Sequence, residues 1–259
     1  MLRRWFELMM AEQERLAQII TAAVRLHAPV RSSRPEELPF LSQPVSGIAN
    51  AVTDTLRAGE PARMACADGT LILEPWVAPP RLVVFGGGHV GRAVARTAAG
   101  AGFRVTVADD RAKYANPERF PEAAQTLVLD FADAALAARV GPGAYVVIVT
   151  RGHAFDETVL GSVLASDARY IGMIGSRKKV LSAMRNLHSR GAALDALRRV
   201  HAPIGLEIGA VTAEEIAVSI VAQLIRVRRG APSPAYDKSD GLRPLLEELE
   251  PRPLIATRP

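Results

Sequence analysis

Apolar and polar positions alternate in blocks through the middle of the chain, from about residue 80 to residue 230. Short apolar runs predict β-strands at 81–85, 104–109, 126–129, 145–149 and 169–174. The segments between them predict helices at 89–101, 132–139, 156–166, 177–190 and 212–229. The run 145–149 is apolar throughout, as is typical of a strand buried on both faces. This alternation predicts an α/β fold, a doubly wound parallel sheet of the Rossmann-like type, over residues 80–230.

The two ends of the chain differ from this pattern. Residues 1–79 predict a small cap and linker, with an amphipathic helix at 2–26, a second helix at 47–58 and a hairpin at 63–74 that turns at Asp68-Gly69. Residues 231–259 are rich in proline and irregular, so we expect a mobile tail there.

A glycine-rich loop directly follows the first central strand. Gly86, Gly88 and Gly91 have the spacing G-x-G-x-x-G, and an alanine-rich helix follows. The first glycine permits a tight turn, the second lets the backbone approach a phosphate, and the third lets the helix pack on the strand. Backbone amides at the helix N-terminus would bind an anion there, beside His89.

The second strand ends in Asp109, and Arg111 lies two residues further on. An acid at this point can hold a ribose diol, and a neighbouring arginine tolerates a phosphate. The pair therefore favours neither NAD nor NADP. In the alternative interpretation, Asp109 only caps the end of the strand.

The segment after the fourth strand contains Thr150, Arg151, His153 and Asp156. Asp156 lies where a helix should begin, so we predict it as the N-cap. His153 and Asp156 could form a proton-handling pair or half of a metal site, or His153 could simply bond to the loop backbone. Two groups do not complete a zinc site, so we predict no metal centre.

Ser176, Arg177, Lys178 and Lys179 follow the fifth strand, where Ser176 can cap the next helix. Cations in the first turn of a helix are unfavourable by roughly 0.3–1 kcal/mol each, which favours a second anion pocket. Alternatively, these side chains only extend into water. Further along, glycines at 205 and 209 allow close approach of a ligand or another backbone, and Thr212 with Glu215 predicts a capping box.

Composition narrows the possible partners. The chain has 259 residues, 49% of them hydrophobic, and no apolar run approaches the ~18 residues of a membrane helix. Glu7 interrupts any signal peptide, so we expect a cytoplasmic protein without a membrane partner. The single cysteine, Cys66, excludes an internal disulfide and is either a buried hydrophobe or a reactive thiol. Net charge is +5, with seven Lys or Arg against one acid over 171–200. Aromatic residues do not interleave with that run, so we expect no nucleic-acid partner.

Taken together, the motifs resemble those of the xanthine dehydrogenase accessory family, the XdhC/CoxI proteins, over about residues 70–230. The matching strings lie at 82–91, 107–111, 150–157, 170–178 and 201–209. The resemblance implies a cytoplasmic maturation factor rather than an enzyme. Such a factor would bind the molybdenum cofactor (molybdopterin), guard it while a terminal oxo ligand is exchanged for sulfur, and deliver it to an apo molybdenum hydroxylase of the xanthine or carbon monoxide dehydrogenase type. A cysteine desulfurase would be a second partner, and we expect a homodimer through the terminal helices.

The resemblance also implies roles for the motif residues. The three loop glycines would bind a pterin phosphate or pyrophosphate, and Asp109 a ribose or pterin group. Ser176, Arg177 and Lys178 would bind a second anion. The cavity near the metal would be lined by His89, His153 and Asp156.

The chain departs from the family in two places. Arg151 replaces a histidine that many members carry, and residues 1–69 lack the family's Gly-Ser…Pro-Arg…Gly-Ala motif. Two other functions stay open: an NAD(P)-dependent oxidoreductase with His153 as proton donor, and a regulatory ligand sensor.

Overall fold

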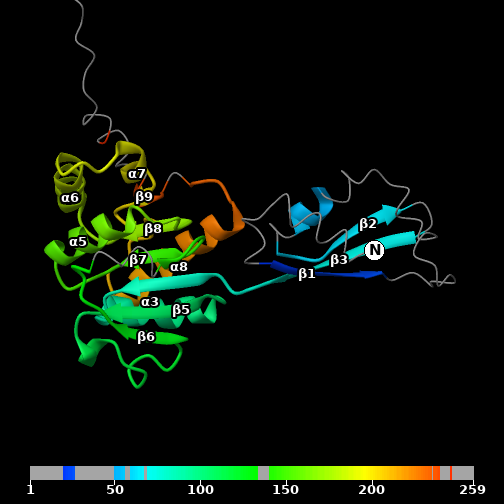
Figure 1. The fold of residues 1–259 in the computed structure, drawn as a ribbon, viewed down its shortest axis with the longest axis horizontal. Coiled ribbons are helices and arrows are strands. Elements are labelled where there is room, and N and C mark those ends of the chain that lie inside the picture. The colour runs from blue at the N-terminus through cyan, green and yellow to red at the C-terminus, as the bar shows by residue number, and fades with distance from the viewer. Residues whose placement is uncertain are drawn as a thin grey trace, which may run out of the picture. The chain divides into compact units, whose positions relative to one another are not determined.

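The computed structural model describes residues 20–26, 50–55, 59–66, 69–133, 140–234, 236–239 and 246. The chain divides into two compact units, Met1–Ala78 and Pro79–Pro259 (Figure 1).

The described part of the first unit contains a three-stranded antiparallel sheet in the order β1-β3-β2. Its strands are β1 (Ile20–Leu26), β2 (Ala62–Cys66) and β3 (Gly69–Val77). The β2–β3 hairpin confirms the one predicted from the sequence. Because Cys66 pairs with Gly69, that glycine belongs to the second strand rather than to the turn.

The helix predicted over 2–26 is wrong for its last seven residues, which form β1. This strand pairs with β3 along its whole length, from Ile20↔Val77 to Leu26↔Leu71. Ile20, Thr21 and Val24 are β-branched and suit a pleated strand, so a partner some fifty residues away overrides the helical periodicity. Residues 2–19 lie outside the described part. The second predicted helix is present at 50–55, and its flanks are not described.

The second unit contains a six-stranded parallel sheet in the order β6-β5-β4-β7-β8-β9. Its strands are β4 (Arg81–Phe85), β5 (Arg104–Asp109), β6 (Gln125–Val128), β7 (Tyr145–Ile148), β8 (Tyr170–Met173) and β9 (Val200–His201). The chain leaves β4 in one direction through β5 and β6, and continues on its other side with β7. The order of the strands therefore reverses between β4 and β7, and such a switch point is where ligands bind in open α/β sheets.

Helices cover both faces of this sheet (Figure 1). The helices are α3 (His89–Gly100), α5 (His153–Val163), α6 (Arg177–Ser189), α7 (Leu194–Arg198) and α8 (Ala213–Arg229). Helices α3 and α8 pack on one face, and α5 and α6 on the other. No helix in the described ranges is long and apolar enough to cross a membrane.

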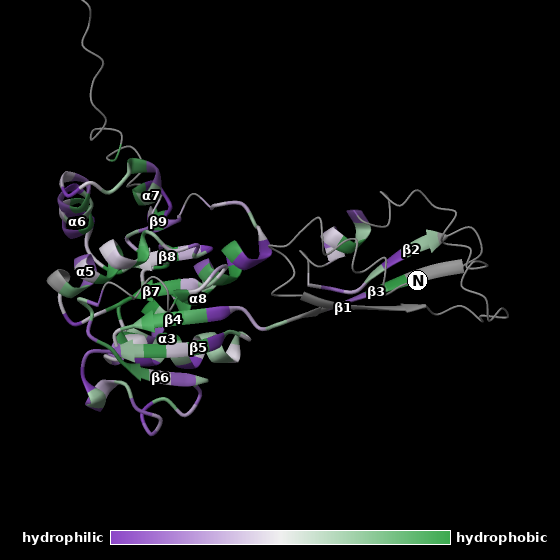
Figure 2. Cartoon of the chain, in the orientation of Figure 1, coloured by the Kyte–Doolittle hydropathy of each residue, from purple (hydrophilic) through white to green (hydrophobic). Residues whose placement is uncertain are grey.

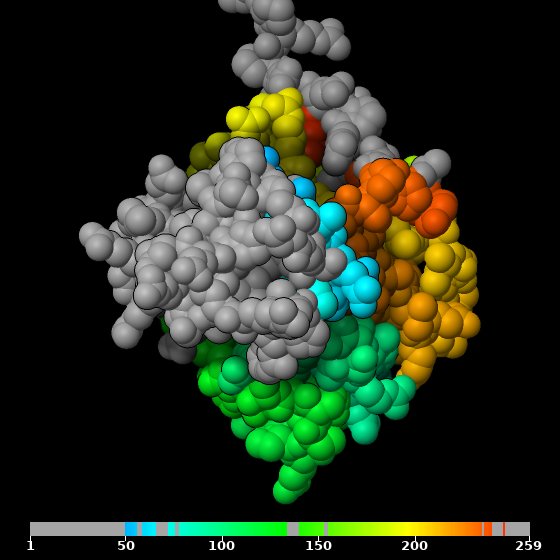
Figure 3. Space-filling model, turned by 90° about the vertical axis from the view of Figure 1, so that its right-hand side faces the viewer, coloured from blue at the N-terminus to red at the C-terminus, as the bar shows by residue number. Residues whose placement is uncertain are grey.

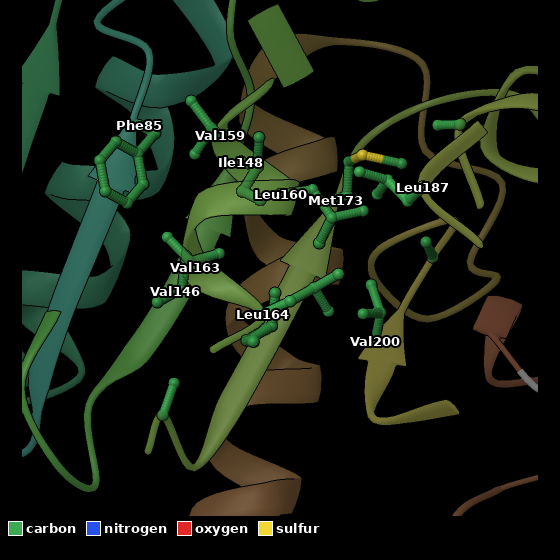
Figure 4. Packing of buried hydrophobic residues seen from close by; sticks show 14 of the residues in the cluster. Phe85, Val146, Ile148, Val159, Leu160, Val163, Leu164, Met173, Leu187 and Val200 are labelled. Carbon is green, nitrogen blue, oxygen red and sulfur yellow. The ribbon is translucent and has the colours of Figure 1, made fainter. Parts of the chain in front are cut away.

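The alternation of side chains along each strand builds the two cores. Leu82 and Val84 of β4 face α3 and α8, whereas Val83 and Phe85 join the opposite cluster. Figure 4 shows that opposite cluster, where side chains of α5 lie against Phe85 of β4 and Ile148 of β7. The central strands β4 and β7 are correspondingly hydrophobic in Figure 2. Because these strands are buried on both faces, they are continuous apolar runs in the sequence, which is why they could be predicted.

The five predicted strands are confirmed, with small shifts at their ends. No pattern in the sequence indicated the two-residue strand β9, the helix α7 or the 3₁₀ turn η3 (Ala112–Tyr114). Four of the five predicted helices are also confirmed, although α5 begins three residues earlier than expected. The fifth, at 132–139, lies largely outside the described residues.

Parts of the predicted tail pack on the second unit, at Asp237, Ser239 and Leu246, and the mobility of the tail stays a prediction. Leu246 belongs to the core, and Asp237 is buried with a carboxylate that accepts hydrogen bonds from Gln223 Nε2 at 2.7 Å and Arg226 Nη2 at 2.9 Å. The space-filling view shows the orange residues of α8 and of the segment after it as one surface (Figure 3). Buried charges persist only when they are paired, and this pairing ties the segment to α8.

Candidate functional site

The parallel topology brings the predicted site segments to one edge of the sheet. Strands β4, β7 and β8 are neighbours, and the loops after their carboxyl ends lead into α3, α5 and α6. The N-cap positions of these helices are Gly88, Gly152 and Ser176, and none of them makes a side-chain capping hydrogen bond. Three helix N-termini with their backbone amides therefore lie along this edge.

Two of the three motif glycines serve backbone packing. Gly86 has φ +110°, and a Cβ there would collide with the carbonyl of Val149. A Cβ on Gly91 would collide with the carbonyl of Gly86, which is the close approach of helix to strand that the motif predicts. Gly88 differs, because apart from its own chain neighbours no heavy atom lies within 4 Å of where its Cβ would be. It is thus the loop glycine that faces open space at the start of α3.

Gly87, which sequence reasoning missed, is covered by the protein itself. Its N–H donates to Asp109 Oδ2 at 2.8 Å, and its carbonyl accepts from Arg119 Nε at 3.0 Å. A Cβ on Gly87 would collide with the carbonyl of Tyr114 in η3. The only signal in the sequence was the run of three consecutive glycines at 86–88.

Asp109 is an ionised anchor for this loop. The side chain is buried, and besides Gly87 it accepts hydrogen bonds from the backbone N–H of Arg111 at 3.1 Å, from its Nε at 2.9 Å and from its Nη2 at 3.3 Å. Burial raises the pKa of Asp109, but the hydrogen bonds from Arg111 and Gly87 outweigh it and lower the pKa below its usual value. The side-chain hydrogen bond between Arg111 and Asp109 also raises the pKa of Arg111. Both oxygens of Asp109 are therefore engaged within the protein.

Asp110 and Arg151 form an ion pair across the carboxyl end of β4. Arg151 Nη2 lies 2.7 Å from Asp110 Oδ2, and the guanidinium carbon lies 4.7 Å from the centre of the Phe155 ring. Asp110 follows β5 and Arg151 follows β7, so the pair joins the loops on either side of the glycine loop. The sequence analysis did not include Asp110 among the site residues.

Asp156 does not cap α5 as predicted. The helix begins at His153 with Gly152 as its N-cap, and Asp156 lies within the first turn. Its Oδ1 accepts hydrogen bonds from the backbone N–H of Thr150 at 3.0 Å and from Thr150 Oγ1 at 2.7 Å. The buried carboxylate thus fixes the turn between β7 and α5. The pairing of His153 with Asp156 stays a prediction.

The first turn of α6 presents its cations to solvent. Ser176, Arg177, Lys178 and Lys179 are all exposed. Within the part of the chain that the structure describes, the three cations form no ion pair or hydrogen bond. Their positive charge therefore adds to that of the helix N-terminus, and an anion would relieve the repulsion.

Helix α8 shows how this chain caps a helix with its own side chains. Thr212 and Glu215 form the predicted capping box, with Glu215 N–H donating to Thr212 Oγ1 at 3.2 Å and Thr212 N–H donating to Glu215 Oε2 at 2.9 Å. The exposed Glu215 has a lowered pKa because of these backbone hydrogen bonds.

The second glycine-rich segment is packed against the protein at Gly205, because a Cβ there would collide with Ser219 Oγ.

The groups gathered at this edge suit anions. Apart from the carboxylates of Asp109, Asp110 and Asp156, which are paired within the protein, they are helix amides, guanidinium groups and ammonium groups, with the exposed His89 at the start of α3. Among the residues that the structure describes, no group of three or more His, Cys, Asp or Glu could hold a metal ion.

Comparison with known proteins identifies the family. The family model described as the XdhC Rossmann domain matches residues 82–224, which is more than half of the chain. The chain belongs to the XdhC family. The matched range begins in β4 and ends in α8, so it contains the glycine loop, the Asp110–Arg151 pair and the first turn of α6.

Two curated relatives of this XdhC domain are similar over about 150 residues. The "Uncharacterized protein YqeB" of Escherichia coli (strain K12) is 38% identical over 154 residues, which is 59% of this chain and 28% of that protein. A protein of Bacillus subtilis (strain 168) described as a probable xanthine dehydrogenase subunit is 33% identical over 151 residues, which is 58% of this chain and 43% of that protein. The alignments thus span less than half the length of either relative.

A solved structure shares the fold. It is a crystal structure described as a xanthine dehydrogenase from Bacillus halodurans, with a TM-score of 0.53 and 23% sequence identity. The superposition covers 87% of this chain and 80% of that one.

Proposed function

We propose that this protein is a maturation factor for a molybdenum hydroxylase of the xanthine or carbon monoxide dehydrogenase type. It binds the molybdenum cofactor, holds it during sulfuration by a cysteine desulfurase, and transfers it to the apoenzyme. Family membership and the similarity to a probable xanthine dehydrogenase subunit support this role. The single observation that carries it is the row of helix N-termini without side-chain caps, at Gly88, Gly152 and Ser176, along one edge of the sheet.

The residues at this edge fit the cofactor as a phosphorylated pterin. Gly88 leaves open space beside the first amides of α3, which can donate to phosphate oxygens. Arg177 and Lys178 at the start of α6 can bind a second anionic group, such as the oxygens around the metal. Asp109 and Asp156 hold the two loops in place without occupying these donors. The cofactor itself would supply the metal chemistry, and the chain would supply binding, orientation and protection.

An NAD(P)-dependent oxidoreductase is the alternative from a different class of protein. It needs a carboxylate for the ribose diol, and Asp109 already accepts hydrogen bonds at both oxygens. This engagement disfavours recognition of a ribose diol at the end of β5. Turnover with NAD(P)H that His153→Ala abolishes would instead support the oxidoreductase.

The first experiment measures bound cofactor. The full chain would be purified from a molybdate-supplied host, and molybdenum would be quantified by mass spectrometry and pterin by fluorescence after oxidation. We expect both in proportion to protein. A ligand at 100 times its dissociation constant should also stabilise the fold by about 2.7 kcal/mol.

A matched pair of glycine variants makes this experiment specific. Gly88→Ala adds a methyl group to the open space where a phosphate would approach, whereas Gly100→Ala adds one at the exposed far end of the same helix. We expect both variants to fold, Gly88→Ala to lose the cofactor and Gly100→Ala to keep it. Equal retention by both variants, or none in the wild-type protein, would contradict the proposal.

A second experiment addresses the partners. Loaded protein would be mixed with an apo molybdenum hydroxylase, with and without a cysteine desulfurase, and hydroxylase activity would be followed. We expect hydroxylase activity to appear only when both the loaded protein and the cysteine desulfurase are present. Light scattering would test the expected homodimer.

A further inference from the structure

The ion pair between Asp110 and Arg151 spans the end of β4, at the edge of the sheet where the proposed function places the ligand. Strands β5 and β7 flank β4, so a contact between their following loops passes over the end of β4 and the glycine loop. The strand order reverses between β4 and β7, and ligands of open α/β sheets bind outside the carboxyl ends of the strands at such a switch point. The pair therefore occupies the approach to the first amides of α3.

The Arg151 side chain is held in place but remains accessible. Asp110 binds it at 2.7 Å and the Phe155 ring lies beneath it at 4.7 Å, yet 45% of the side chain is exposed. A guanidinium in this setting can exchange one anionic partner for another without losing its stacking contact. Arg151 thus has both the charge and the exposure that binding a phosphate requires.

Asp110 has a second cation available if Arg151 leaves. Its Oδ1 lies 3.4 Å from Arg111 Nε and accepts no hydrogen bond in the part of the chain that the structure describes. Arg111 is itself fixed by Asp109. The carboxylate of Asp110 would therefore keep a neighbouring positive charge after Arg151 turned towards a ligand.

Building on the proposed function, we infer that Arg151 is the cation that binds the ligand's phosphate group at the glycine loop, and that Asp110 is its internal competitor. In the protein without ligand, Asp110 holds the guanidinium across the loop. A phosphate at the start of α3 then displaces the carboxylate from Arg151. The phosphate could be a monoester, as on a pterin, or a pyrophosphate, as in a dinucleotide form.

The test is a double-mutant cycle on the full chain with Asp110→Asn, Arg151→Gln and both together. Binding of inorganic pyrophosphate and of glycerol 3-phosphate would be measured by calorimetry at low ionic strength, where surface charges act most strongly. Asp195→Asn is the control, because that exposed carboxylate also pairs with an arginine, Arg198, but lies on α7. The preferred probe shows which phosphate chemistry the site recognises.

Competition predicts opposite signs for the two single variants. We expect Arg151→Gln to weaken binding about tenfold or more, as for the loss of a charge-assisted hydrogen bond. Asp110→Asn should tighten binding by about 1.4- to 5-fold, the range for releasing an exposed ion pair. In the Arg151→Gln background, Asp110→Asn should have no effect, and Asp195→Asn should have none in either background.

Three outcomes would overturn the inference. Weaker binding by Asp110→Asn would make Asp110 a direct ligand contact instead of a competitor. Independent effects of the two substitutions would show that they do not act through one ion pair. If the wild-type protein bound neither probe, the anion site of the proposed function would fail as well, which distinguishes that failure from the other two.

Discussion

Asp109 accepts a hydrogen bond from the backbone N–H of Gly87 at 2.8 Å, so the end of β5 fixes the loop that leaves β4. The two residues are 22 positions apart; Asp109 ends β5, and Gly87 lies in the loop that follows the neighbouring strand β4. Arg111 completes the arrangement by donating to both oxygens of the same carboxylate. The shape of the glycine loop therefore depends on an acid that the sequence would assign to a ligand.

Replacing Asp109 should destabilise the fold itself. Asp109→Asn removes the charge that Arg111 pairs with and places an amide where four donors converge. We expect the free energy of unfolding to fall by about 1–3 kcal/mol, the range for a buried polar group that loses its partners. Urea unfolding would measure this, with Asp195→Asn as the control. No change would show that the glycine loop keeps its shape without the carboxylate.

Acid should destabilise the protein through two buried carboxylates. Burial raises the pKa values of Asp109 and Asp237, but hydrogen bonds, from Arg111 and Gly87 in the first case and from Ser239 and Gln223 in the second, lower both below 3.8. Each group's stabilising contribution is complete above its unfolded pKa and is lost as the pH falls through the lower, folded pKa.

The free energy of unfolding should therefore lose this contribution below about pH 4, near the unfolded pKa of an aspartate. Unfolding by urea between pH 3 and pH 7 would record the slope. Asp109→Asn should make that slope shallower, because the substituted side chain no longer takes up a proton. An equally steep slope in the variant would assign acid sensitivity to other carboxylates.

The segment after α8 should depend on Asp237. Its carboxylate also accepts hydrogen bonds from the N–H and hydroxyl groups of Ser239, at 3.0 and 2.6 Å. Asp237→Ala would leave Arg226 and Gln223 without this partner. We expect a loss of about 3 kcal/mol in the free energy of unfolding, as for a broken buried ion pair.

Hydrogen exchange would localise this effect. Lys238 N–H donates to the carbonyl of Gly205, and Glu207 N–H donates to the carbonyl of Tyr236. In Asp237→Ala these two amides should exchange faster while the amides of β7 stay protected. Tyr236→Ala is the control, since it removes an exposed ring and keeps the backbone contacts. Loss of protection throughout the sheet would mean global unfolding instead.

The sequence predicted the second unit well because burial there is two-sided. Tyr145–Ile148 is buried at every position and could be recognised without any partner. By contrast, β1 exists through pairing with β3, and β9 has only two residues, so neither carries a pattern of its own. Local periodicity cannot report an element that a distant strand creates.

The candidate site was predictable in its position and less so in its contacts. Parallel topology alone places Gly88 and Ser176 at one edge, because each follows the carboxyl end of a strand in the same parallel sheet. The roles of Asp109, Asp110 and Asp156 each depend on a contact with a residue that is 6 to 41 positions distant. A motif gives the residue types of such an edge, but only the folded chain shows which polar groups are already paired.

The cations in the first turn of α6 should affect the stability of the protein and its binding of anions in opposite directions. Arg177, Lys178 and Lys179 lie in the first turn, where the helix dipole disfavours positive charge. Replacing all three with glutamine should raise the free energy of unfolding of the unliganded protein by about a few tenths of a kcal/mol per charge. The same variant should bind inorganic pyrophosphate more weakly than the wild-type protein, and the difference should shrink as salt screens the charges.

A matched variant controls for net charge. Three exposed arginines lie away from the carboxyl edge of the sheet. Arg81 begins β4, Arg96 lies on α3 and Arg104 begins β5. Replacing these three with glutamine removes the same charge but should leave pyrophosphate affinity nearly unchanged. If both triple variants weakened binding equally, attraction by net charge alone would explain the affinity. If the α6 variant lost stability, its cations would be structural, and the first turn of α6 would not be a binding surface.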